Sequence, residues 1–240
     1  MMPKTAILQL DHDQAPDRAL VVGDPARAAK AAQMLTNTQT LSQVREYHCF
    51  AGDWGGTRVL VASHGVGGGG ASICFEELIQ AGVRTLIRAG TCGSFQPTYR
   101  EGSLIIATGA VRNDGVSDVL VPPGYPAVAD YRIVAALAEA AAQNGVNHGV
   151  GLCLTDGPFY PGVLGDGHRL WAEAGVLGVE MEVATLFVVA GLRGARAGAI
   201  LNVDNYIFER EVYEPNREIV HQGTARMLDV ALNALVNVEA

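Results

Sequence analysis

Residues 58–81 read RVLVASHGVGGGGASICFEELIQA, and this stretch has three parts with different patterns. Residues 58–63 form an apolar run of strand length, and residues 64–70 are mostly glycine. Residues 71–81 then place apolar side chains at helical spacing. A strand, a glycine turn and a helix in this order predict one unit of an α/β fold.

The same alternation continues on both sides of this stretch. Apolar runs of strand length predict strands at residues 19–22, 58–63, 85–89, 103–107, 149–155, 176–180 and 197–203. Helical spacing predicts helices at residues 26–34, 71–81, 131–143, 182–192 and 215–235. A chain of 240 residues is long enough for one large core and short for two, so we expect a single layered α/β domain over residues 1–240.

Composition excludes several classes of function. A formal net charge of -8 argues against nucleic acid as a partner, because binding its backbone needs clustered Lys and Arg. The four cysteines form no CxxC pair and the six histidines show no ligand spacing, so we expect neither a disulfide framework nor a metal site. Without a bilayer-length apolar run or a signal peptide, we expect no membrane association and a cytoplasmic location.

The glycine turn fits two kinds of ligand loop. Residues 65–70 match G-x-G-x-x-G, the spacing of a dinucleotide-binding turn. That site also needs an acidic residue about twenty positions further on, where this chain has Arg88 instead. A phosphate or small-ligand loop therefore fits better, and the alternative is that the glycines only let a helix pack closely on the sheet.

Charged residues gather where predicted strands end, which is where open α/β sheets bind ligands. Arg27 and Arg88, together with Thr91 and the turn amides expected at residues 90–93, suit a phosphate. Glu180 and Glu182 would share one face of an extended segment, where a carboxylate can accept from two vicinal hydroxyls; the alternative is an acid that stabilises a helix N-terminus.

Two further positions suggest how a ligand base could be handled. Asp204 follows an apolar strand, so partial burial there would favour a carboxyl group that donates a proton near neutrality. Phe159 and Tyr160 lie in a proline-flanked loop, where they can stack on a flat base or close the edge of a core.

Nine short motifs together resemble the hexameric nucleoside phosphorylases, the family of purine nucleoside phosphorylases and uridine phosphorylase. The resemblance covers nearly the whole chain, and NVD is most similar to the protozoan purine enzymes. The motifs are VVGDPARA (21–28), REY (45–47), SHGVGGGG (63–70), CFEEL (74–78), IRAGTCGSFQP (87–97), PAVADY (126–131), FYPG (159–162), VEMEVATL (179–186) and NVD (202–204). This family implies three α/β/α layers around a mixed sheet.

The resemblance also implies phosphorolysis, in which a nucleoside and inorganic phosphate give a free base and ribose 1-phosphate without a cofactor. It implies a homo-oligomer, a hexamer built as a trimer of dimers, in which Arg45 reaches a neighbouring site. The implied phosphate ligands are Gly23, Arg27, Arg45, Arg88 and Thr91; the ribose ligands are Met181 and Glu182; Cys92, Gly93 and Phe159 contact the base; and Asp204, assisted by Arg217, is the catalytic acid.

Three positions bear on the substrate. Uridine phosphorylases of this family hold uracil with a Gln and an Arg just after FYPG, where this chain has Val163 and Gly165, so we expect a purine substrate. Ile7 stands where the family usually has a histidine for the sugar 5'-hydroxyl, which favours 5'-deoxy or 5'-methylthio nucleosides. The alternatives are a uridine or broad-specificity phosphorylase, a 5'-methylthio-nucleoside phosphorylase, a hydrolytic nucleosidase and, from another class, an inactive nucleoside-binding module.

Overall fold

The computed structural model describes residues 4–12, 15–209 and 217–238. Its strands are β1 (Arg18–Val22), β2 (Thr36–Val44), β3 (Tyr47–Trp54), β4 (Thr57–Ser63), β5 (Thr85–Ser94), β6 (Leu104–Asn113), β7 (Ala127–Val128), β8 (His148–Asp156), β9 (Gly178–Glu180) and β10 (Arg196–Tyr206). Its helices are α1 (Pro25–Met34), α2 (Gly68–Gln80), α3 (Val116–Leu120), α4 (Tyr131–Gln143), α5 (His168–Glu173), α6 (Val183–Arg193) and α7 (Glu218–Asn237).

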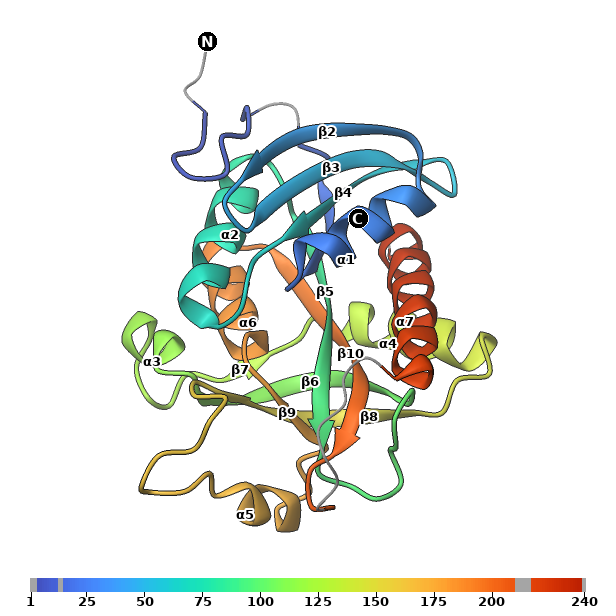
Figure 1. Cartoon of the computed structure of the whole chain (residues 1–240). Coiled ribbons are helices and arrows are strands. Elements are labelled where there is room, and N and C mark those ends of the chain that lie inside the picture. The colour runs from blue at the N-terminus through green and yellow to red at the C-terminus, as the bar shows by residue number, and fades with distance from the viewer. Residues whose placement is uncertain (1–3, 13–14, 210–216, 239–240) are drawn as a thin grey trace.

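All of these strands belong to one mixed sheet, in the order β10-β6-β8-β9-β5-β1-β4-β3-β2, with β7 paired to β6 (Figure 1). Strands β4, β1, β5 and β10 run parallel to one another. Strand β5 also pairs with β9, so β5, β10, β6, β8 and β9 close into a ring. This curvature brings the ends of β5, β9 and β10 together.

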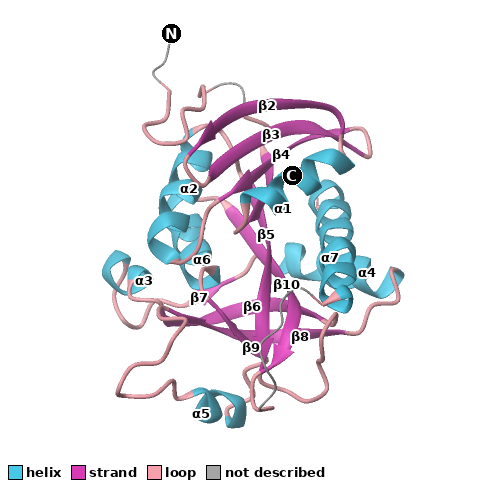
Figure 2. Ribbon diagram, in the orientation of Figure 1, coloured by secondary structure: helices cyan, strands magenta, loops and turns pink. Residues whose placement is uncertain are grey.

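Helices cover both faces of the sheet, which confirms the predicted α/β fold with its mixed sheet (Figure 2). Along β1 the side chains alternate between two cores. Ala19 and Val21 pack with α2 and α6, whereas Leu20 and Val22 pack with α1, α4 and α7. Because successive strand residues face opposite sides, a strand buried on both faces is an unbroken apolar run, as the sequence predicted.

Strands β2 and β3 are absent from the sequence-based prediction, although they form a long hairpin at the sheet edge. Strand β2 is polar and mostly exposed, so it has no apolar alternation that marks a strand. The short elements β7, α3 and α5 were missed as well. The predicted start of the last helix at residue 215 lies outside the described residues, and no described helix has the length and apolarity to cross a membrane.

The expectation of a turn at residues 90–93 is wrong. Strand β5 continues to Ser94, and its second half pairs with β10 on one side and β9 on the other. These backbone groups therefore belong to the sheet, and Thr91 and Cys92 offer a ligand mainly their side chains, while the Ile207 side chain covers Gly93.

Candidate active site

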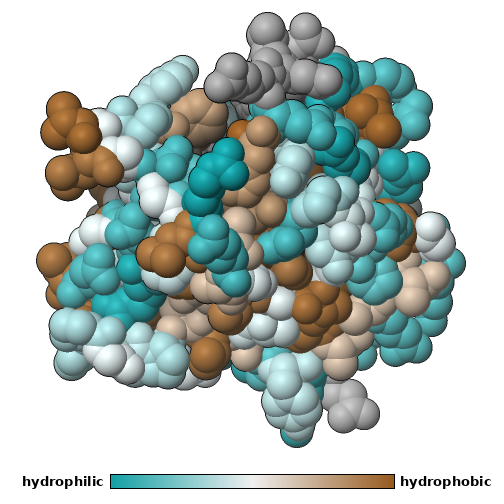
Figure 3. Space-filling view, turned by 90° about the horizontal axis from the view of Figure 1, so that it is seen from below, coloured by the Kyte–Doolittle hydropathy of each residue, from teal (hydrophilic) through white to brown (hydrophobic). Residues whose placement is uncertain are grey.

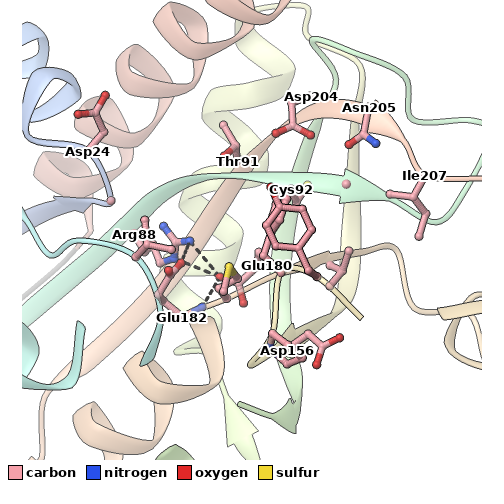
Figure 4. A pocket seen from close by; sticks show the side chains of 18 of the residues that line it. Asp24, Arg88, Thr91, Cys92, Asp156, Glu180, Glu182, Asp204, Asn205 and Ile207 are labelled. Atoms are coloured by element: carbon pink, nitrogen blue, oxygen red, sulfur yellow. Dashed lines mark hydrogen bonds and ion pairs between the residues drawn. The ribbon is translucent and has the colours of Figure 1, made fainter. Parts of the chain in front are cut away.

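A cavity of about 1010 Å³ lies where β1, β4, β5, β8, β9 and β10 end. Ten of the twelve residues predicted for the site line it, and Figure 4 shows several of them around one space. These ten are Gly23, Arg27, Arg88, Thr91, Cys92, Gly93, Phe159, Met181, Glu182 and Asp204. The two others, Arg45 and Arg217, lie outside the lining.

One end of the cavity is formed by the loops after β1 and β4. Asp24 caps α1 by accepting from the Ala26 N–H at 2.8 Å, which fixes the helical turn that carries Arg27. The Gly65 N–H donates to the Gly23 carbonyl at 2.9 Å, and a Cβ on Gly23 would lie 3.4 Å from the Gly65 carbonyl oxygen. The two loops therefore pack backbone to backbone at this end of the cavity.

Arg88 is a buried cation in the middle of β5. Its guanidinium lies over Gly90, at a place that a Cβ would occupy. It forms ion pairs with Glu180, at 3.0 Å, and with Glu182 (Figure 4). Burial disfavours the charge of Arg88, but these two carboxylates outweigh burial and raise its pKa. Within the described part of the chain, Nη1 of Arg88 has no hydrogen-bond partner.

Arg27 is the second cation at this end. Burial, followed by the nearby charge of Arg88, lowers its pKa. An anion held between these two guanidinium groups would relieve that repulsion, because each supplies charge-assisted donors to oxygen. Thr91 adds a hydroxyl to the same cavity. This end of the site therefore suits an oxyanion such as phosphate.

Glu180 and Glu182 have different tasks. The Glu180 carboxylate accepts from the Thr155 hydroxyl at 2.6 Å and from the backbone N–H groups of Glu182 and Val183, at 2.7 and 3.0 Å. Glu180 thus stabilises the start of α6, the role that sequence reasoning considered for Glu182. Its fixed carboxylate also orients Arg88.

Glu182 faces the cavity and makes no side-chain cap on α6. Its carboxylate accepts from the Gly67 N–H at 2.5 Å and pairs with Arg88. Burial is the main cause that raises its pKa, against the opposing charge of Arg88. The glycine run contributes in two ways that the sequence did not predict: the Gly67 N–H binds this carboxylate, and the missing side chain at Gly68 lets α2 approach Thr185 on α6. A phosphate loop at residues 65–70 stays a prediction.

The opposite end of the cavity is lined by Cys92 and Gly93 on β5, by Asp204, and by residues of the loop after β8. Burial raises the pKa of the Cys92 thiol well above its usual range. Asp204 lies beside Cys92 and Gly93 with 6% of its surface exposed. Phe159 comes from the loop after β8, is 61% exposed, and packs edge-to-face against Tyr160 with ring centroids 5.1 Å apart.

Several lining residues had no role assigned from the sequence. They include Asp156, His168, Asn205, Ile207 and Phe208. His168 places Nε2 3.3 Å from Asp156 and Nδ1 3.4 Å from Asp166, so it joins the two ends of the loop that carries Phe159. Asp156 and Asn205 each follow a predicted strand, which was the only signal for them in the sequence.

The two predicted residues outside the lining occupy distinct positions. Arg45 is exposed, with a φ of 54°, in the turn between β2 and β3, next to the cavity-lining Glu46. Arg217 precedes α7, and its Nη2 donates to Glu101 at 2.7 Å and to the backbone carbonyl of Asp204 at 3.2 Å. Arg217 therefore touches the segment that carries the predicted acid.

Taken together, the cavity has two arginines at one end, the buried Glu182 carboxylate between its ends and the Asp204 carboxyl group at the opposite end. In the described ranges no group of three or more potential metal ligands occurs. A large cavity with converging charged groups is the arrangement of an enzyme active site for a small polar substrate.

Comparison with known proteins gives the family. Residues 17–237 match the Phosphorylase superfamily. The chain is 37% identical over 229 residues to the uridine phosphorylase of Haemophilus influenzae, with 90% of each chain covered. It is 36% identical over 233 residues to the purine nucleoside phosphorylase of Plasmodium vivax, covering 94% of this chain and 93% of the relative.

Solved structures of nucleoside phosphorylases have the same fold as this chain. The purine nucleoside phosphorylase from Toxoplasma gondii in complex with immucillin-H has a TM-score of 0.94 at 30% identity, covering 99% of this chain and 97% of that one. A uridine phosphorylase from Vibrio fischeri has a TM-score of 0.91 at 29% identity, covering 98% and 97%. The chain belongs to the nucleoside phosphorylases of the Phosphorylase superfamily, a class of pentosyltransferases.

Proposed function

We propose that this nucleoside phosphorylase acts on purine ribonucleosides, with inorganic phosphate as second substrate and without a metal or organic cofactor. The observation that carries the proposal is buried Asp204 in the cavity lining, at the end opposite Arg27 and Arg88. Relatives of nearly equal identity are purine and uridine phosphorylases, so their names do not decide the base.

The loop after β8 favours the same choice. A uracil edge needs fixed hydrogen-bonding side chains, and Val163 and Gly165 offer none. Val163 is fully exposed and neither residue lines the cavity. The carboxyl group of Asp204 also lines this end of the cavity, and an acid there suits a leaving group that takes a proton on a ring nitrogen.

The residues divide the reaction between them. Arg27, Arg88 and Thr91 hold phosphate so that one of its oxygens attacks the anomeric carbon as the glycosidic bond breaks. Glu182 and Met181 hold the ribose, with Glu182 accepting from the vicinal hydroxyls. Charge develops as positive on the sugar and negative on the base, so the anion on one side and the proton from Asp204 on the other stabilise the same transition state.

The proposed enzyme is a cytoplasmic homo-oligomer, a hexamer built from dimers. Arg45 is exposed at the tip of the β2–β3 hairpin, where it can complete the phosphate site of a neighbouring subunit. Large apolar side chains are also exposed, among them Val66, Val119, Tyr131 and Leu164. Figure 3 shows several separate hydrophobic groups between hydrophilic ones on one side of the molecule.

Ile7 supports a second candidate substrate, because the family resemblance aligns it with a histidine that a neighbouring subunit supplies to the sugar 5'-hydroxyl. Ile7 donates its backbone N–H to the Glu77 carboxylate at 2.9 and 3.0 Å, and its side chain packs against the core beside α2. An apolar residue cannot hydrogen-bond a 5'-hydroxyl. We therefore include 5'-methylthio nucleosides among the proposed substrates.

The test is a comparison of kcat/KM for inosine, guanosine, adenosine, uridine and 5'-methylthioinosine at saturating phosphate. We expect purine ribonucleosides to exceed uridine by about tenfold or more, the discrimination that one lost hydrogen-bonding group supplies. We also expect 5'-methylthioinosine to match inosine within about tenfold. A preference for uridine would overturn the purine assignment.

A further inference from the structure

The end of β10 contains an irregularity that places two neighbouring side chains on the same ligand. Val203 pairs with Cys92 and Asn205 pairs with Gly93, so Asp204 is an extra residue on β10 with no partner on β5. In a regular strand, residues 204 and 205 would face opposite sides of the sheet. A β-bulge re-aims side chains, and here both Asp204 and Asn205 line the cavity.

Asn205 is placed to meet a flat ring rather than the protein. Figure 4 shows its amide next to the Asp204 carboxylate. Its Oδ1 lies 3.3 Å from where a Cβ on Gly93 would be, and the Ile207 side chain fills that same place. Within the described ranges, the half-buried Asn205 amide makes no hydrogen bond to the protein. An amide with donor and acceptor both unused, beside the apolar Ile207 in the cavity lining, is suited to the edge of a heterocycle.

We infer that Asn205 is a specificity-determining residue that hydrogen-bonds the group at position 6 of the purine while Asp204 serves N7. This inference rests on the proposed purine function. N7 and the 6-substituent are neighbouring atoms on one edge of the base, as Asp204 and Asn205 are neighbours on the bulge. The amide donates to a 6-oxo group or accepts from a 6-amino group, so the wild-type enzyme takes both classes of purine.

Two variants separate recognition from structure. In Asn205→Asp the carboxylate is an acceptor only, so it accepts from a 6-amino group and repels a 6-oxo group. We expect the ratio of kcat/KM for adenosine over inosine to rise about tenfold or more. An effect of the new carboxylate on Asp204 that changes kcat/KM equally for adenosine and inosine cancels in that ratio. Asn144→Asp, which makes the same change at the exposed end of α4, is the matched control and leaves the ratio unchanged.

Asn205→Ala covers the case in which the Asp variant does not fold. We expect it to lower kcat/KM by about tenfold for both inosine and adenosine, but by less than about twofold for purine riboside, which has no group at position 6. Equal losses on all three nucleosides, or an unchanged adenosine-to-inosine ratio in Asn205→Asp, would overturn the role of Asn205 while purine cleavage by the wild type still stands. A wild-type enzyme that cleaves no purine nucleoside would instead overturn the proposed function itself.

Discussion

At the residue scale, the site depends on charges held in a largely buried place. Arg88 is surrounded by Glu180 and Glu182, and Arg27 lies close enough for its pKa to fall in response to Arg88. Such a cluster is costly unless each charge has a partner. A bound phosphate would accept from Nη1 of Arg88, which has no partner within the described residues, and would offset the repulsion between Arg88 and Arg27. This links the stability of the cluster to its proposed use.

Asp204→Asn tests the proposed acid. The amide has nearly the same shape but does not serve as a general acid, so we expect kcat/KM for inosine to fall by about 10²–10⁴-fold. Any cleavage of uridine is expected to fall less. Asp118→Asn, at an exposed carboxylate paired with Arg112, is the matched control. Equal losses for both bases would contradict the role of Asp204.

Cys49 gives a pH dependence of stability. Burial raises the pKa of its thiol from 9.0 to about 11. The folded protein therefore keeps this proton longer than the unfolded chain, so the associated stability is complete below pH 9 and is lost as the pH rises to 11. Urea unfolding across this range should show the loss. In Cys49→Ala, the loss of free energy of unfolding between pH 9 and pH 11 should be smaller by about 3 kcal/mol, the equivalent of two pKa units. An unchanged pH profile in this variant would contradict the assignment to Cys49.

Much of this residue-level site could be predicted from the sequence, because Gly23, Arg27, Glu182 and Asp204 lie at or just beyond apolar strands. Asn205 could not be assigned a role. Its orientation depends on a register shift against β5, and pairing between segments over a hundred residues apart leaves no local pattern in the sequence.

At the element scale, glycines set the distances between segments. Gly90 makes room on β5 for the guanidinium of Arg88, and Gly68 makes room between α2 and α6. The sequence predicted most of the helices and buried strands, since their apolar spacing is local. It missed the polar hairpin of β2 and β3 and ended β5 too early, because tertiary pairing rather than composition holds those residues in the sheet.

Gly90→Ala tests this packing. Its Cβ would collide with the Arg88 guanidinium, so we expect the affinity for phosphate to fall by about tenfold or more, as when a charge-assisted hydrogen bond is lost. The control is Gly69→Ala, where a Cβ meets nothing within 4 Å in the first turn of α2. Unchanged phosphate affinity in a folded Gly90→Ala protein would show that Arg88 does not need its present position.

At the scale of the whole molecule, residues from two subunits form each active site of the proposed oligomer. Arg45→Ala and Asp204→Asn should each be nearly inactive alone. When the two variants are refolded together, an Arg45→Ala subunit keeps Asp204 and can receive Arg45 from an Asp204→Asn neighbour. We therefore expect a substantial part of the activity to return. Mixing either variant with Asp118→Asn is the control for simple dilution. No recovery from mixed oligomers would contradict a shared site.

The most direct test of the account is the dependence of base release on phosphate. With inosine as substrate, we expect no hypoxanthine without phosphate, a saturable rise as phosphate is added, and one ribose 1-phosphate for each base. This follows from the cationic end of the cavity formed by Arg27 and Arg88. Release of the base in phosphate-free buffer at the same rate, with free ribose as the product, would contradict it.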